Sequence, residues 1–239
     1  LVTSADTLLF GYLNAVIEGQ PLGVFYGGQY ERNADGSIFY DNVTTGGRTL
    51  SLPMRARVRR TDGTYNITGT AINGVIGDPN PSLIANFGNT FSFGDRVQLS
   101  VLFDGRFGGD VANFSRRIEE LFGAGKAAEL EISGDTVFRT FSLNPAGRSL
   151  IYEEYIEDGS FVKLREISVS YALSDRIANF VGASGATLRF AGRNLHTWTS
   201  YSGLDPEVNL FGASPVAQGV EFGNTPIPRS FVLGVNLRM

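Results

Sequence analysis

The residues with the greatest capacity for chemistry lie in one polar, aromatic segment near the end of the sequence. His196 is the single histidine, and Ser202 and Asp205 follow it closely, so the residue types of a hydrolytic triad are present. A triad of this kind also needs its serine on a strained turn between a strand and a helix, and no such nucleophile elbow surrounds Ser202. We therefore expect a loop or rim histidine here, and not an enzyme.

Two aromatic residues of the same segment, Trp198 and Tyr201, are the candidate substrate-binding residues. Their rings could stack on a sugar or a peptide. The same residue types also pack loops, and they form the aromatic belt where a protein meets the surface of a membrane. The sequence leaves both interpretations open and favours a structural role.

Three charged clusters could bind ions or substrates, although each has a simpler explanation. The run from Glu31 to Gly36 lacks the first aspartate and the twelfth glutamate of a calcium loop, so we expect an Asp-Gly turn. The arginines at 55, 57, 59 and 60 could contact lipopolysaccharide phosphates or an anionic substrate, but a solvated hairpin face is the default. The acidic residues at 153, 154, 157 and 158 could include a glycosidase pair, but a solvated loop is the simpler interpretation. We expect no metal ion and no cofactor.

Composition indicates an all-β protein with many turns. The 239 residues include 30 glycines, well above the average usage of about 7%. There is no cysteine, which excludes a disulfide framework and a thiolate metal site. A net charge of −4 spread along the chain argues against nucleic acid as a partner. No run of about 18 apolar residues is present, but a membrane-spanning strand needs only about 9–11 residues with every second one apolar.

Five segments alternate apolar and polar residues with the period of a β-strand. They run from Ala85 to Phe93, from Val97 to Asp104, from Glu166 to Leu173, from Thr187 to Leu195 and from Arg229 to Met239. About six strands are visible in all, too few to close a membrane barrel, for which about eight is the minimum. Because the chain starts at Leu1 with no initiator methionine and no signal peptide, we expect it to be part of a longer protein.

The connections between these strands alternate between short and long. The link at Gly94-Asp95 is minimal, and the one from Ser174 to Gly185 is short, with a possible helical turn from Ile177 to Phe180. Long connections run from Gly105 to Gly159 and from Trp198 to Pro228. This asymmetry is typical of outer-membrane barrels, which have short periplasmic turns and long extracellular loops.

Three further elements are expected outside the long strands. Weak helical periodicity from Val111 to Leu130 predicts a short loop helix capped by Gly123. The stretch from Val16 to Tyr30 is a strand pair or a kinked strand. The stretch from Glu31 to Pro81 is a long excursion with its own hairpin.

Four motifs resemble those of the SusC/RagA-like TonB-dependent outer-membrane transporters. The most specific is N-L-x-T-W-x-x-Y-S-G-L-D-P-E, from Asn194 to Glu207. The others run from Pro21 to Gly27, from Ile76 to Pro81 and from Glu157 to Arg165, and all four occur in the family's order. The final strand also resembles the family's barrel-assembly signal, but it ends in Met239 where the family usually has phenylalanine.

The resemblance implies that residues 1–239 are the C-terminal portion of a transmembrane antiparallel β-barrel, 22-stranded in the family, without its plug domain. It implies active import of oligosaccharides or oligopeptides, with a SusD-like surface lipoprotein, the TonB complex and outer-membrane lipids as partners. TonB would act through segments outside these residues. A soluble β-sandwich that binds carbohydrate or protein is the alternative, and an outer-membrane enzyme is a third, less favoured possibility.

The membrane interpretation predicts which face each side chain of the strands occupies, because the lipid is apolar and the lumen of such a barrel is polar. The side chains predicted to face outward are Phe87, Phe91, Val97, Leu99, Val101, Val169, Tyr171, Leu233, Val235 and Leu237. Those predicted to face the lumen are Asn86, Gln98, Ser100, Ser168, Ser170, Asn236 and Arg238.

Overall fold

The computed structural model describes residues 3–4, 7–10, 13–45, 48–122, 124, 150–210, 212–213 and 217–239. The chain divides into two compact units. We call one the sheet unit, which comprises Pro81–Gly108, Gly159–Tyr201 and Thr225–Met239. We call the other the loop unit, which comprises Leu1–Asn80, Gly109–Asp158 and Ser202–Asn224.

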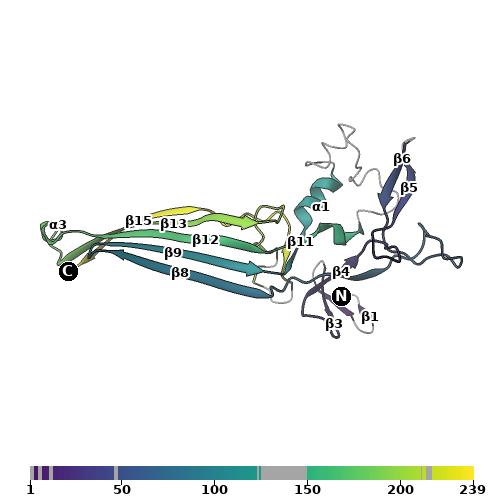
Figure 1. The fold of residues 1–239 in the computed structure, drawn as a ribbon, viewed down its shortest axis with the longest axis horizontal. Helices are drawn as coiled ribbons and strands as arrows, with labels where there is room; N and C mark the ends of the chain where they lie inside the picture. Colours follow the sequence, from purple (N-terminus) through teal and green to yellow (C-terminus); the bar gives the residue numbers. More distant parts are fainter. Residues whose placement is uncertain are drawn as a thin grey trace. The chain divides into compact units, whose positions relative to one another are not determined.

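The sheet unit is a five-stranded antiparallel meander in the order β15-β13-β12-β9-β8 (Figure 1). Its strands are 9–15 residues long, at or above the roughly 9–11 residues that a tilted strand needs to cross a membrane. All five correspond to the alternating segments of the sequence, where about six strands were expected in total. Their bounds are β8 (Leu83–Phe93), β9 (Val97–Phe107), β12 (Phe161–Ala172), β13 (Gly185–Thr199) and β15 (Ser230–Arg238).

Both short connections leave the same end of this sheet. Phe93 pairs with Val97, so the first turn holds three residues, Gly94 to Arg96, where the sequence suggested two. Gly94 adopts a φ of +60°, which glycine tolerates without strain. The second connection contains the expected helical turn as α3 (Asp175–Phe180). Among the described residues, no helix is both long enough and apolar enough to cross a membrane.

The loop unit is built from small sheets joined by short helices. One sheet has the order β1-β2-β3-β4-β7, and the expected strand pair is its β3 and β4. In a second sheet, β10 lies between β11 and β14. A separate two-stranded sheet, β5 and β6, is the expected hairpin. The strand bounds are β1 (Thr3–Ser4), β2 (Thr7–Phe10), β3 (Asn14–Ile17), β4 (Val24–Gly28), β5 (Tyr40–Thr45), β6 (Arg48–Pro53), β7 (Asn73–Gly77), β10 (Asp110–Asn113), β11 (Ile156–Asp158) and β14 (Val220–Glu221).

The predicted loop helix is α1 (Phe114–Leu121), and a 3-10 turn, η3 (Tyr152–Tyr155), precedes β11. Asn113 caps α1, because its side-chain oxygen accepts a hydrogen bond from the Arg116 backbone N–H. The cap at the other end is Phe122. The expected cap at Gly123, and residues 125–130 of the predicted range, lie outside the described residues.

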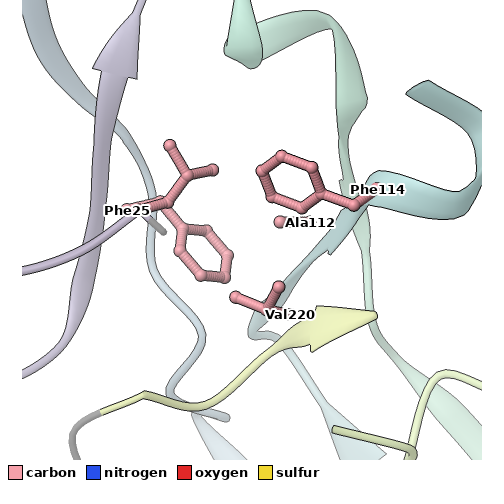
Figure 2. Close-up of a cluster of buried hydrophobic side chains, with 5 residues drawn as sticks. Phe25, Ala112, Phe114 and Val220 are labelled. Atoms are coloured by element: carbon pink, nitrogen blue, oxygen red, sulfur yellow. The ribbon is translucent and has the colours of Figure 1, made fainter. Parts of the chain in front are cut away.

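A small apolar core joins the parts of the loop unit that are far apart in sequence. Phe25 of β4, Ala112 of β10, Phe114 of α1 and Val220 of β14 point toward one another, as Figure 2 shows, and Leu13 belongs to the same cluster. Phe25, Ala112 and Val220 are completely buried. Because so few buried side chains hold four segments together, each of them is expected to matter for stability.

We predict that Phe25→Ala lowers the free energy of unfolding of the loop unit by about 3–5 kcal/mol, the usual cost of truncating a buried phenylalanine. Leu204→Ala is the matched control, because Leu204 belongs to the same unit and is 77% exposed. Limited proteolysis of the full-length protein in detergent, with cleavage sites mapped to the loop unit, measures the effect. Equal cleavage rates for the two variants would contradict the assigned core.

Candidate functional site

The strand register divides the sheet unit into an apolar face and a polar face. Phe87 pairs with Phe103, Val101 with Ile167, and Phe190 with Leu233, so apolar side chains meet across every strand. The apolar residues that the sequence predicted to face outward all fall on this side, and the predicted lumen residues all fall on the other. The predicted division into two faces is therefore confirmed.

The apolar face is exposed along the whole sheet. Each strand contributes an exposed apolar side chain: Phe87 of β8 (59% exposed), Phe107 of β9 (40%), Val169 of β12 (40%), Phe190 of β13 (50%) and Leu233 of β15 (76%). A face of this extent in water would carry a large hydrophobic penalty, and soluble monomers rarely show one. These side chains are therefore not in a dry core between two sheets, which is where a β-sandwich would place them.

The polar face carries all the formal Asp, Glu, Lys and Arg charge of the five strands. It holds two acidic and six basic residues, although the chain as a whole has a net charge of −4. Arg189 and Arg193 both donate to the Glu166 carboxylate, at 2.7 and 2.8 Å. Arg165 donates to Asp104 in the same way. The charged residues of this face are Asp104, Arg106, Lys163, Arg165, Glu166, Arg189, Arg193 and Arg238.

Trp198, one of the two candidate substrate-binding residues, lies on the apolar face near the end of β13. Its ring centroid is 6.3 Å from that of Phe103 and 4.5 Å from that of His196, which meets it edge-on. Phe103 in turn lies 6.5 Å from Phe87. Exposed aromatic side chains near the end of an apolar strand, such as Trp198 in β13, suit the aromatic belt at a membrane interface, whereas Phe87 and Phe103 pair nearer the middle of β8 and β9. Substrate binding by Trp198 stays a prediction.

Tyr201, the other candidate, is only 5% exposed. Its backbone N–H donates to Thr199 Oγ1 at 3.1 Å, and the Thr199 hydroxyl donates to the Ser160 carbonyl at 2.7 Å. The structure therefore ties Tyr201 to the ends of β12 and β13. A ring this buried offers little surface for stacking, so substrate binding by Tyr201 also stays a prediction.

The triad residue types are each engaged in other contacts. The Ser202 hydroxyl is hydrogen bonded to Glu157 at 2.8 Å, and the Asp205 carboxylate accepts from the Glu207 backbone N–H at 3.0 Å. The His196 ring meets the Trp198 ring edge-on. None of these contacts links the serine to the histidine or the histidine to the aspartate, as a triad requires.

Glu157 connects three segments of the loop unit, where the sequence suggested a solvated loop. Its Oε1 accepts from the Asn113 amide at 3.1 Å, from Arg116 at 3.1 Å and from the Ser202 hydroxyl at 2.8 Å. Its Oε2 accepts from the Ser202 backbone N–H at 2.8 Å. Burial alone raises the pKa of Glu157, but the hydrogen bonds from Ser202, Arg116 and Asn113 outweigh it and hold that pKa below its ordinary value.

The other charged clusters are also used structurally. Glu153 accepts from Arg32 and from the Tyr30 backbone N–H, so the expectation of a solvated acidic loop is wrong for this residue too. Asp35 forms the expected turn, accepting from the backbone N–H and hydroxyl of Ser37. Arg55 is 8% exposed, which corrects the expected solvated face at this arginine. In the described part of the chain, no three side chains of the types that ligate metals converge on one point.

Comparison with known proteins finds relatives among TonB-dependent receptors. No family model matches it. It is 29% identical over 228 residues to the TonB-dependent receptor P3 of Formosa agariphila, covering 92% of this chain and 22% of that protein. It is 31% identical over 174 residues to the TonB-dependent receptor P26 of the same organism, covering 68% of this chain and 17% of that protein. The chain thus spans about a fifth of the length of these relatives.

Solved structures agree on the fold. The RagAB peptide importer in its open-open state superposes with a TM-score of 0.60 at 20% identity, over 100% of this chain and 25% of that chain. The closed-closed state gives a TM-score of 0.59 at 20% identity, over 99% of this chain and 25% of that chain. The mostly β structure therefore matches a part of such a transporter.

We predict that Val235→Arg destabilises the protein in lipid by about 2–4 kcal/mol, the cost of an arginine on the lipid side at mid-membrane. Asn236→Arg is the matched control, because it adds the same side chain to the next residue of β15, on the polar face. Urea unfolding of the full-length protein in vesicles measures both. A loss for Val235→Arg no greater than that for Asn236→Arg would exclude lipid contact.

Glu157→Gln should weaken the loop unit in a pH-dependent way. Because the folded-state pKa of Glu157 is lowered, its stabilisation is present above the unfolded pKa of about 4.3 and is lost as the pH falls through the folded pKa. We expect a loss of about 1.5–3 kcal/mol at neutral pH, typical of hydrogen bonds to a charged group, and convergence with wild type in acid.

Proteolysis within the loop unit, followed as a function of pH, tests this expectation. Glu18→Gln is the control, because Glu18 is exposed at the turn after β3. A difference between Glu157→Gln and wild type that stays constant from neutral to acidic pH would show that the carboxylate charge is not responsible.

Proposed function

Because the chain is homologous to TonB-dependent receptors, a non-enzymatic transporter family of the outer membrane, we propose that it forms part of the wall of an outer-membrane β-barrel. The intact protein would import oligosaccharides or oligopeptides actively, with energy delivered through TonB. The observation that carries the proposal is the exposed apolar face, continuous over five long antiparallel strands and free of formal charge.

A soluble β-sandwich that binds carbohydrate or protein was the alternative, and the same observation counts against it. A sandwich buries the apolar face of each sheet against the other sheet. Here that face is exposed, and in water an uncovered apolar edge and face of this length would favour aggregation. Lipid is the environment that removes the penalty.

In this proposal the intact protein extends beyond these 239 residues. We assign residues 1–239 to the C-terminal portion of a barrel of about 22 strands, with a plug domain encoded elsewhere in the protein. The two edge strands of the sheet unit, β8 and β15, support this assignment. Unpaired strand edges are not tolerated in lipid, so each edge needs a further strand as neighbour.

The strand directions give a topology for this wall. β15 ends at the same end of the sheet as the two short turns, because Arg238 pairs with Gly185. The long connections leave from the other end, after β9 and after β13. In outer-membrane barrels the short turns are periplasmic and the long loops extracellular. These two long connections are therefore assigned to the cell surface.

This topology gives each partner a side of the membrane. A SusD-like surface lipoprotein would act as a lid on the extracellular side, as the presence of two components in RagAB suggests. The description of RagAB as a peptide importer makes peptide the first cargo to test, with oligosaccharide as the second. TonB would bind segments outside these residues, and neither nucleic acid nor a cofactor has a part in the proposal.

Surface-restricted thiol labelling of intact cells tests the topology, because these 239 residues contain no cysteine. Thr225→Cys, in the long connection before β15, should react with a reagent that does not cross the membrane. Asp95→Cys, in the short turn, should react only after the cells are opened. The reverse pattern would overturn the topology, and unchanged uptake of every peptide and oligosaccharide tested after deletion of the gene would overturn transport.

A further inference from the structure

The short helix α3, in the connection between β12 and β13, carries an exposed apolar stripe. Ile177, Phe180 and the C-cap residue Val181 follow the spacing i, i+3, i+4, which places them on one side of a helical turn. All three are exposed, and Phe180 is exposed by 90%. Asp175 and Asn179 are spaced i, i+4, so these two exposed polar residues lie together on the other side. The turn is therefore amphipathic, and its apolar side faces away from the protein.

Two alanines, and not the stripe, attach α3 to the rest of the sheet unit. Ala178 of α3 is completely buried, and Ala183, just after the helix, is buried as well. The Ala183 backbone N–H donates to the Ala178 carbonyl at 3.0 Å, and α3 lies beside β13. The fold of this connection therefore does not depend on the three apolar side chains of the stripe.

Hydrogen bonds hold both ends of the connection to the sheet. Before α3, the Leu173 backbone N–H donates to the Ala186 carbonyl at 2.9 Å. After it, the backbone N–H and the hydroxyl of Ser184 both donate to the Arg238 carbonyl, at 2.6 and 2.9 Å. The stripe is therefore kept at the end of the sheet where β12 and β15 finish, as Figure 1 shows.

The apolar face of the sheet continues to this same end. The last row that crosses all five strands consists of Phe93, Val97, Tyr171, Leu188 and Val235, which pair in that order. Phe93 and Tyr171 are exposed aromatic residues, of the kind that lie where a membrane meets water. Leu237, one position nearer the end of β15 on the same face, is exposed too. The exposed apolar surface thus reaches the level at which α3 begins.

We propose that α3 is an interfacial anchor, whose Ile177, Phe180 and Val181 side chains insert into the periplasmic leaflet of the outer membrane. The proposal rests on the proposed function, because the spanning sheet brings this turn to the membrane surface. Apolar side chains gain free energy when they leave water, and phospholipid is the apolar phase that borders this end of the apolar face. Amphipathic helices lie in this way at the boundary between headgroups and acyl chains.

Charge does not drive the proposed contact. α3 contains one acidic residue, Asp175, and one basic residue, Arg176, and both are exposed. Attraction to anionic lipid needs an excess of lysine or arginine. Insertion should therefore be the same in vesicles of phosphatidylcholine alone and in vesicles that also contain phosphatidylglycerol.

The experiment attaches an NBD fluorophore to Phe180→Cys in the full-length protein, with any cysteine outside these 239 residues replaced, in phosphatidylcholine vesicles. We expect its emission to shift to the blue, to be quenched by a nitroxide carried on the lipid and to be protected from iodide present on both sides of the membrane. Asn179→Cys is the matched control, because the same fluorophore is then attached one residue away, on the polar side of α3. There we expect strong quenching by iodide and little by the lipid nitroxide.

A second variant tests whether the stripe itself inserts, and not the fluorophore alone. Replacing Ile177 and Val181 by asparagine should reduce the blue shift at position 180. Because both side chains are exposed, the circular dichroism of the β-sheet should stay as in wild type. An unchanged blue shift in this variant would overturn the anchor.

Three other results would also contradict the proposal. Equal quenching by iodide at positions 179 and 180 would show that the stripe stays in water. Protection from iodide without quenching by the lipid nitroxide would show that a protein covers the stripe. Insertion only in the presence of phosphatidylglycerol would show that charge, and not apolar contact, is responsible.

These outcomes are distinct from failure of the transport proposal. If the thiol labelling supports the topology but position 180 stays in water, the transporter stands and the anchor does not. If position 180 inserts while deletion of the gene leaves uptake unchanged, the anchor stands and the transport function does not.

Discussion

In the proposed membrane setting the sheet unit depends on one constraint: backbone polar groups in lipid have no water to bind, so every strand must pair with its neighbours along its whole spanning length. Continuous pairing fixes the register, and the register fixes the face of every side chain, because one residue of slip moves each side chain to the opposite face. The five strands meet this constraint with one face free of formal charge and the other carrying two acidic and six basic residues.

One irregularity tests how strictly the faces are kept. Glu166 of β12 pairs with Leu102 of β9 and with Arg193 of β13. The next paired residue of β12, Leu164, pairs with Phe103 of β9 and with His196 of β13. Between these two sets of pairs the chain covers one residue in β9, two in β12 and three in β13. Arg165 is the bulged residue of β12, and Asn194 of β13 has a φ of +52°. Phe103, Leu164 and His196 remain on the apolar face, so the bulge changes local geometry while the division into faces persists.

The sequence predicted the wall well because alternation is a local signal. The positions of all five strands, and the face on which each side chain lies, were predicted from residues within each strand. The family motifs supplied the resemblance to TonB-dependent transporters. It could not predict the role of Glu157, whose partners Asn113 and Ser202 lie 44 and 45 residues away. Nor could it show that Tyr201 is buried or Arg55 enclosed, because burial of a loop residue depends on segments that meet only after folding. The sequence suggested a turn of two residues at Gly94, and the structure has three. An error of one residue is usual at the end of a strand.

The two units solve different stability problems. In the proposed membrane setting the sheet unit exchanges water for lipid on its apolar face, so its apolar side chains need no protein partner. The loop unit has two small buried clusters, and much of its cohesion comes from charged groups that link distant segments. Glu157 joins β10, α1 and the chain after Tyr201, while Glu153 joins η3 to the segment at Tyr30 and Arg32. Unlike apolar packing, hydrogen bonds and ion pairs are directional, and each needs both a donor and an acceptor in place. A connection held in this way can keep a defined shape with little core.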